Sequence, residues 1–151
     1  MTCIRPSTTD DREALLSLWL RSVRATHTFL SETDIVALIP AVRDGALVML
    51  EVWVLADHDD RPLGFMGLDG AKLEALFIDP AHTGNGGGTK LVAHARQLKG
   101  ELTVDVNEQN PDALAFYVAQ GFRATGRSET DGEGRPFPLI HMHANVIWPA
   151  S

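Results

Sequence analysis

The chain contains a single cysteine, Cys3, and no apolar run long enough to cross a membrane. One cysteine cannot form an intramolecular disulfide or a multi-cysteine metal site. A membrane-spanning helix needs about 18 or more consecutive apolar residues, which the sequence does not offer. The first residues, from Met1 to Pro6, lack the basic start and the apolar segment of a signal peptide. These absences predict a cytoplasmic protein without a membrane partner.

The sequence also lacks an excess of basic residues, since its net charge is -7 and its pI is near 5.2. Proteins that bind nucleic acid are usually basic, so we expect no nucleic-acid partner. Hydrophobic residues make up 44% and charged residues 22% of the 151 residues, which is the balance of an ordinary globular domain. Because no repeat and no linker interrupts the chain, we expect one domain over residues 1–151.

Apolar periodicity and capping residues predict alternating strands and helices. Pro40 ends or kinks the second helix, and a later helix has an apolar face that includes Leu91 and Leu98. In chain order the expected elements are a strand at 3–5, a helix at 8–26, a second helix from Ser31, strands at 48–56, 63–68 and 73–79, a helix after the loop 84–88, a strand at 101–106, a helix from 110 to 121, and strands at 122–129 and 139–147. This order predicts an α/β fold, a mixed sheet with helices on both of its faces.

Residues 76–91 form a strand, a glycine-rich turn and the start of a helix. Backbone N–H groups at a helix N-terminus form an anion site, and glycines let the chain approach a phosphate closely. A P-loop would need a glycine where Thr89 stands, and the dinucleotide fingerprint fails at the same residue. The spacing of Gly84, Gly86 and Gly88 instead fits a G-x-G-x-G turn that opens a helix directly.

A second motif, Asn110-x-x-Ala113-x-x-x-Tyr117-x-x-x-Gly121-Phe122, follows the next strand. Asn110 caps a helix there, and Gly121 suits its left-handed end. Tyr117 is the one tyrosine of the chain, and it lies about two turns after Asn110, so both side chains can face the same cleft. The alternative role of Tyr117 is a core aromatic residue whose hydroxyl finds a partner.

The two motifs together make the chain similar to the GNAT superfamily, the Gcn5-related N-acetyltransferases, as a small bacterial-type member. The resemblance implies a mixed, mostly antiparallel sheet in which two parallel strands, 73–79 and 102–106, splay apart and hold acetyl-CoA between them. It also implies direct attack of an amine on the acetyl group within a ternary complex. The implied cofactor contacts are the main-chain groups of Leu76, Phe77 and Ile78, the amides of Gly84, Asn85, Gly86, Gly87, Gly88 and Thr89, and the side chains of Asn110 and Asn107.

Two residues depart from the family pattern. Thr83 replaces the usual arginine or glutamine before the first glycine, which removes a donor near the phosphates. Gly87 replaces an aliphatic residue and adds backbone freedom, which costs about 0.5–1 kcal/mol relative to alanine in a helix. The amides remain, so we expect weaker acetyl-CoA binding rather than none.

The chemistry needs a proton acceptor, a donor to the oxyanion and a partner for the leaving thiolate. By the resemblance, the N–H of Ile78 meets the oxyanion and Tyr117 meets the thiolate. Full proton transfer from a tyrosine of pKa about 10 to a thiolate of pKa about 8.5 is uphill by roughly 2 kcal/mol. Tyr117 therefore either has a lowered pKa or donates a hydrogen bond. Strand alternation places Glu74 on the face of Leu76 and Ile78, which makes Glu74 a candidate base.

His27 and Phe29 lie between the first two helices, at the border of the acceptor pocket that the resemblance implies. His27 is a substrate-binding residue, a second candidate base or a plain helix-end histidine. Glu74 likewise has the alternative of a solvated carboxylate. His141 and His143 share one strand face, but two histidines without a third ligand predict no metal site.

The leading hypothesis is an acetyl-CoA-dependent N-acetyltransferase that acts on a primary amine of a small molecule, a peptide or a protein. One alternative is a regulatory module that binds acyl-CoA but has no catalytic activity. Another is an enzyme that acetylates charged tRNA, against which the acidic charge argues. Members of the family often dimerise, so a homodimer is one expectation for the assembly.

Overall fold

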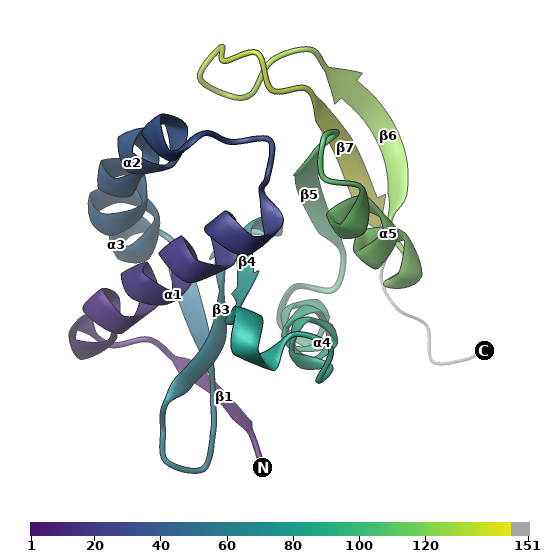
Figure 1. Cartoon of the computed structure of the whole chain (residues 1–151). Helices are drawn as coiled ribbons and strands as arrows, with labels where there is room; N and C mark the ends of the chain where they lie inside the picture. Colours follow the sequence, from purple (N-terminus) through teal and green to yellow (C-terminus); the bar gives the residue numbers. More distant parts are fainter. Residues whose placement is uncertain (146–151) are drawn as a thin grey trace.

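The computed structural model describes residues 1–145. Its elements are, in chain order, β1 (Cys3–Pro6), the 3-10 turn η1 (Thr9–Asp11), α1 (Arg12–Thr26), α2 (Glu32–Pro40), the π-helical turn η2 (Ala41–Ala46), α3 (Leu47–Met49), β2 (Glu51–Ala56), β3 (Pro62–Asp69), β4 (Lys72–Ile78), the 3-10 turn η3 (Pro80–His82), α4 (Gly87–Lys99), β5 (Leu102–Asn107), α5 (Pro111–Ala119), β6 (Arg123–Ser128) and β7 (Leu139–Ala144). Within the described range the strands form one seven-stranded sheet in the order β1-β2-β3-β4-β5-β7-β6 (Figure 1). The predicted order of elements and the α/β fold are confirmed.

The pair β4 and β5 is parallel, and its pairing is short. Lys72 pairs with Thr103 and Leu73 with Val104, and beyond these residues the two strands diverge (Figure 1). The other neighbouring strands of the described sheet run antiparallel. The mostly antiparallel sheet with a splayed parallel pair is therefore present, and its opening begins just after Leu73.

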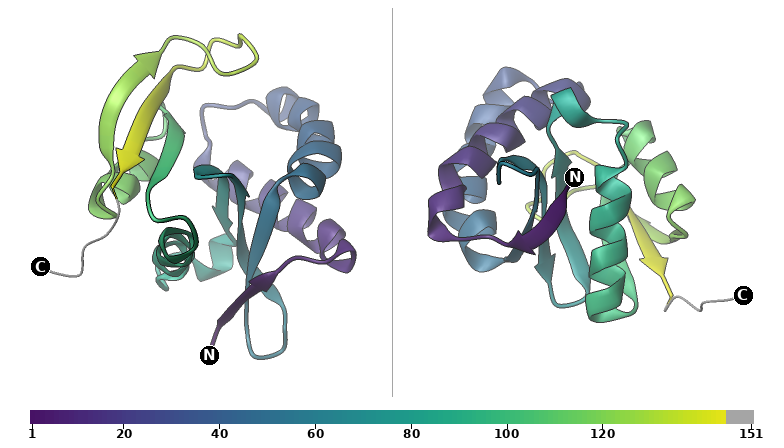
Figure 2. Two further views of the ribbon diagram at one scale, coloured as in Figure 1. Left: turned by 180° about the vertical axis from the view of Figure 1, so that it is seen from behind. Right: turned by 90° about the horizontal axis from the view of Figure 1, so that it is seen from below.

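Helices cover both faces of the sheet (Figure 2). On one face α1 and α2 pack through buried residues such as Leu18, Trp19 and Ile35. On the other face α4 and α5 pack through residues such as Leu91 and Tyr117. None of the helices between residues 1 and 145 has the length and apolar character to span a membrane.

The caps that the sequence predicts are formed. Ser31 accepts the N–H of Asp34 at 3.1 Å, and the Asp34 carboxylate accepts the N–H of Ser31 at 3.0 Å, so a reciprocal cap begins α2. Asn110 accepts the N–H of Ala113 at 3.2 Å at the start of α5. Gly121 follows that helix with a φ of +93°, the left-handed conformation that glycine adopts readily.

Two local predictions were wrong, namely that the second strand begins at Val48 and that the apolar face of α4 includes Leu98. Val48 lies in α3 and not in a strand, and β2 begins only at residue 51. Pro40 does end α2, but the chain continues into η2 and α3, where Leu47 is buried against α1 and α2. This packing overrides the strand preference of Val48. Leu98 is 43% exposed, so the apolar face of α4 ends before its last turn. Ile147, the predicted end of the last strand, lies outside the described residues.

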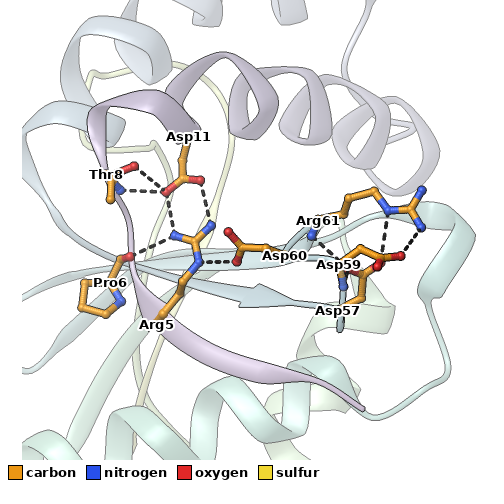
Figure 3. Close-up of polar contacts among 8 residues, drawn as sticks. All are labelled: Arg5, Pro6, Thr8, Asp11, Asp57, Asp59, Asp60 and Arg61. Carbon is orange, nitrogen blue, oxygen red and sulfur yellow. Dashed lines mark hydrogen bonds and ion pairs between the residues drawn. The ribbon is translucent and has the colours of Figure 1, made fainter.

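Arg5 of β1 fastens the first helix to the sheet (Figure 3). Its guanidinium donates to both carboxylate oxygens of Asp11, at 2.8 and 2.9 Å, and its Nε donates to Asp60 in the β2–β3 turn at 2.8 Å. Asp11 also accepts the N–H of Thr8 at 2.7 Å. The hydrogen bond from Arg5 is the main reason that the pKa of Asp11 falls from 3.8 to about 2. The start of α1 is thereby held against β1 and the β2–β3 turn.

Candidate active site

A bulge interrupts β4 at the vertex of the splay. The register of β3 against β4 passes from Leu73 to Ala75, so Glu74 is the extra residue. As a result Leu73 and Leu76, three positions apart, both contact the α4–α5 core. Strict alternation therefore does not extend through Glu74, and the prediction that alternation aligns it with Leu76 was wrong. Glu74 still lines the cleft described below.

The register also assigns the direction of the backbone groups in β4. Asp79 donates its N–H to the carbonyl of Leu63 on β3 at 2.8 Å, and in an antiparallel pair every second residue bonds to the partner strand. Phe77 therefore bonds to β3, whereas the N–H and C=O groups of Leu76 and Ile78 face the opening left by β5. Of the three residues of β4 that were expected to contact the cofactor through the main chain, Leu76 and Ile78 present these groups to the opening, and Phe77 does not.

A cleft of about 380 Å³ opens where β4 and β5 separate. Its walls come from the last turns of α1, from β4 and β5 from their last paired residues onward, and from the starts of α4 and α5. The predicted site residues in its lining are His27, Glu74, Leu76, Phe77, Ile78, Gly88, Asn107, Asn110 and Tyr117. Residues far apart in the sequence are thus brought into one cavity.

The glycine-rich turn ends at Gly86, and the free N–H groups of the first turn of α4 follow it directly. Gly84 and Gly86 have φ angles of +83° and +81°, which glycine adopts without strain. The first backbone bond of the helix joins the N–H of Lys90 to the carbonyl of Gly86 at 3.0 Å. The N–H groups of residues 87–89 therefore have no partner within the helix, and such a helix start suits an anion.

Close packing accounts for the two glycines at the start of α4. A Cβ atom at Gly87 would lie 2.8 Å from Cδ2 of Leu55 and 3.3 Å from Cδ1 of Ile78. A Cβ atom at Gly88 would lie 3.1 Å from the ring of Phe116. Leu55 therefore already fills the space for an aliphatic side chain at position 87, and the absence of a side chain there lets the start of α4 lie against Ile78 of β4.

Tyr117 presents its side chain to the cleft from α5. Its ring makes edge contacts with Phe116 and Phe122, at centroid distances of 5.1 and 5.3 Å, and the residue is 7% exposed. Burial raises the pKa of the Tyr117 hydroxyl above its ordinary value. Of the two roles that the pKa arithmetic left open, a lowered pKa is contradicted, and hydrogen-bond donation is retained.

His27 has a defined tautomer in its neutral form. The hydroxyl of Thr26 donates its one hydrogen to the carbonyl of Ser22 at 2.8 Å, and its oxygen lies 2.8 Å from Nδ1 of His27. The oxygen must then accept a hydrogen from Nδ1, which leaves the lone pair on Nε2. Burial lowers the pKa of His27 below 6.5, so the ring is neutral at pH 7. His27 thus fits the requirements of a proton acceptor in the cleft.

Lys72 joins the two strands at the vertex of the splay. Its Nζ lies 3.1 Å from Oε1 of Glu74 and 2.9 Å from Oδ2 of Asp105 on β5. The hydrogen bond to Asp105 is the main cause that raises the pKa of Lys72, so the amine stays protonated. Burial alone would raise the pKa of Asp105, but hydrogen bonds from His141 and Lys72 lower it overall. Two carboxylates and one ammonium leave a net negative charge at the vertex.

Several residues singled out in the sequence lie outside the lining or make other contacts. Phe29 contacts His27 and Phe137, at centroid distances of 5.4 and 6.1 Å, so it joins the β6–β7 loop to the end of α1. Thr83 lines the cleft, but its hydroxyl donates to the carbonyl of Pro80 at 3.1 Å and stabilises η3. The predicted phosphate-binding residues outside the lining are Gly84, Asn85 and Gly86 of the loop and Gly87 and Thr89 in the first turn of α4.

The sequence reasoning missed three charged residues, Lys72, Asp105 and Asp112, of which the two aspartates line the cleft. Alternation in β5 was the available signal for Asp105, because Val104 and Val106 on either side of it are buried. Among residues 1–145, no group of three or more histidine, cysteine, aspartate or glutamate side chains is arranged to hold a metal ion.

The sequence and the fold are similar to those of known acetyltransferases. The family model described as the acetyltransferase (GNAT) domain matches residues 50–124. The peptidyl-lysine N-acetyltransferase YjaB of Salmonella typhimurium is 46% identical over 149 residues, which cover 99% of this chain and 99% of that protein. The solution structure of apo-form YjaB from Escherichia coli has a TM-score of 0.88 and 45% identity, and covers 95% of this chain and 97% of its own. The PaiA N-acetyltransferase of Thermoplasma acidophilum, solved with coenzyme A, has a TM-score of 0.78 at 21% identity, covers 96% of this chain and 99% of its own, and shows the shared fold.

Proposed function

The chain belongs to the GNAT family and is an acetyl-CoA-dependent N-acetyltransferase, and we propose that the amine it acetylates is the lysine side chain of proteins or peptides. The Salmonella relative is named for action on peptidyl lysine. The observation that carries the proposal is the negative vertex of the cleft, where the carboxylates of Glu74 and Asp105 share one ammonium. An acceptor that arrives as a cation is attracted there.

The residues of this chain fit the acetyl donor, which supplies a thioester carbon for the amine to attack. The amides of residues 84–89 would hold the diphosphate, and the main-chain groups of Leu76 and Ile78 would pair with the pantetheine arm. The side-chain oxygens of Asn107 and Asn110 already accept the N–H groups of Gln109 and Ala113, at 2.8 and 3.2 Å. Their amide N–H groups remain as donors toward the cleft.

Ile78 and Tyr117 would act on opposite ends of the reacting thioester. In this proposal the N–H of Ile78, which faces the opening, stabilises the oxyanion. The hydroxyl of Tyr117 donates a hydrogen bond to the departing sulfur. Because burial raises the pKa of Tyr117, complete proton transfer to the sulfur is more uphill than ordinary pKa values imply, and hydrogen-bond donation carries the effect.

The acceptor must lose a proton before it attacks. A lysine amine of ordinary pKa 10.4 is mostly protonated at pH 7, and its neutral form costs about 4.6 kcal/mol there. In the proposal the carboxylate of Glu74 holds the ammonium and takes its proton, directly or through a water molecule. His27 is the second candidate, since its Nε2 carries the lone pair.

A peptide assay tests the acceptor. We expect release of coenzyme A with a peptide whose α-amine is blocked and which holds one lysine, and mass spectrometry should place the acetyl group on Nζ. The same peptide with arginine in place of lysine should be inert. Turnover of free polyamines with no turnover of any lysine peptide would refute the proposal.

Variants then identify the base. Glu74→Gln should raise the peptide KM and lower kcat, whereas the control Glu133→Gln, which removes a 71% exposed carboxylate in the β6–β7 loop, should change neither. If His27 is the base, kcat of the parent falls as the pH drops through a value below 6.5, because the protonated ring accepts no proton. His27→Gln would remove that limb. An unchanged profile in His27→Gln assigns the proton to Glu74, and an unchanged Glu74→Gln removes Glu74.

A further inference from the structure

Three side chains on neighbouring strands form a second cluster, which shares Asp105 with the vertex of the cleft and adds two residues that the proposed reaction does not use. His141 of β7 lies between Asp105 of β5 and Ser128 of β6. Its Nδ1 is 2.6 Å from Oδ1 of Asp105, and its Nε2 is 2.6 Å from Oγ of Ser128. A hydroxyl, an imidazole and a carboxylate in this order are the nucleophile, base and orienting group of serine acyl-transfer sites.

The sheet itself positions the three side chains. Asp105 and His141 are direct partners across the antiparallel pair β5 and β7. Ser128 pairs with Leu139, two residues before His141, so Ser128 and His141 are diagonal neighbours on β6 and β7. The backbone therefore places all three on one surface of a rigid sheet, and not on loops that would need to rearrange.

The hydrogens in the cluster follow from Asp105. Lys72 occupies its Oδ2 at 2.9 Å, and the pKa of Asp105 lies below the ordinary value, so its Oδ1 is an ionised acceptor. Nδ1 of His141 must then donate to Asp105. In the neutral ring Nε2 is left as an acceptor, and the Ser128 hydroxyl donates to it. This is the proton arrangement in which an imidazole draws the proton from a serine.

We propose that Ser128 is an activated nucleophile that takes acyl groups from activated esters and thioesters, independently of the amine acetylation assigned to the cleft. The bond from Ser128 Oγ to the acyl carbon forms, and the bond from that carbon to the aryl oxygen or the sulfur breaks. The proton of Ser128 passes to Nε2 of His141 and from there to the leaving group.

The chemistry of the cluster selects its substrates. Its three side chains supply the nucleophile, the base and the orienting carboxylate, and none of them donates to an oxyanion. Acyl donors with a good leaving group, such as aryl esters and thioesters, therefore react, and amides do not. A phosphonyl fluoride reacts in the same way at phosphorus, where the bond from Ser128 Oγ forms and the bond to fluoride breaks. His141 is 35% and Asp105 25% exposed in their side chains, so a small acyl donor reaches the cluster from solvent.

The test uses the full-length protein and a fluorophosphonate probe, which reacts with activated serines and releases fluoride. Peptide mapping should find the probe on Ser128. Ser128→Ala should lose that label, and His141→Gln should slow it by about 100-fold or more, the usual contribution of a general base. Asp105→Asn should also slow it, and Asp105→Glu, which keeps the charge, should restore part of the rate.

A neighbouring residue provides the matched control. Thr125 lies on the same strand, and its hydroxyl donates to the main-chain carbonyl of His141 at 3.2 Å, so Thr125→Val should label at the parent rate. Ser128→Ala should keep the amine acetylation, which shows that it is folded.

Two further arms separate the sources of the acyl group. Incubation with p-nitrophenyl acetate and with acetyl-CoA, each without an amine, should acetylate Ser128 and not its alanine variant. Acetylation by the aryl ester alone identifies esters as the donors, and acetylation by both adds thioesters. Labelling that is the same in the parent and in Ser128→Ala with all three reagents would overturn the proposal.

Discussion

Replacement of Tyr117 by phenylalanine removes one hydroxyl group and leaves the packing of the ring. The ring makes edge contacts with Phe116 and Phe122, and these contacts do not involve the hydroxyl. The residue is 7% exposed, so the variant keeps its apolar burial and should fold. Any loss of activity is then assigned to the missing donor.

The size of the effect follows from the charge of the leaving group. A hydrogen bond to a charged group contributes about 1.5–3 kcal/mol. Since about 1.36 kcal/mol corresponds to a tenfold change in rate, kcat should fall roughly 10- to 150-fold. In the proposed mechanism the hydroxyl binds the sulfur most strongly as charge develops, so the KM for acetyl-CoA should change by no more than about twofold.

The assay follows release of the coenzyme A thiol at saturating lysine peptide, with acetyl-CoA varied from below to above its KM. Circular dichroism of the parent and of Tyr117→Phe verifies that both are folded at the assay temperature. The raised pKa adds a second expectation, because Tyr117 stays protonated through pH 9 and contributes no alkaline limb to the profile of kcat. A kcat equal to that of the parent would remove Tyr117 from the mechanism.

Two further predictions concern the glycine turn before α4, which is proposed to bind the cofactor, and the ion pair of Arg5 with Asp11. Gly86→Ala should destabilise the turn by about 1–2 kcal/mol, because the backbone has a φ of +81° there, and calorimetry should show weaker acetyl-CoA binding. The control Gly45→Ala, which also lies in open space but has no positive φ, should bind acetyl-CoA as the parent does. Asp11→Asn should lower the free energy of unfolding by about 1–2 kcal/mol at pH 7, where the Arg5 pair is intact. Because the pKa of Asp11 is lowered to about 2, this stabilisation is complete above pH 3.8 and is lost as the pH falls toward 2, so denaturant curves of the parent and the variant should converge there. A constant difference down to pH 2, or equal binding by Gly86→Ala, would contradict the respective argument.

Residues that lie near one another in the chain carried the successful predictions. The Gly84 and Gly86 turn before α4, the Asn110 cap and the position of Tyr117 two turns later depend on backbone conformation and helical periodicity. These are properties of a few consecutive residues. The same holds for the reciprocal cap at Ser31.

Long-range packing decided the features that the sequence reasoning missed or placed wrongly. Val48 lies in a helix because Leu47 is buried against elements far away in the chain, and the bulge at Glu74 depends on the register with β3. Such a register is set by the whole sheet and not by the strand alone.

The chemistry of the cleft divides in the same way. The sequence by itself determined a glycine turn that opens a helix, a tyrosine on the face of a capped helix and an acidic chain, because composition and local spacing are enough for each. Only the tertiary structure decided that Lys72 joins Glu74 to Asp105, and that His141 lies between Asp105 and Ser128. Apart from the Lys72–Glu74 pair within β4, these contacts join different strands, and their geometry exists only after the strands have paired.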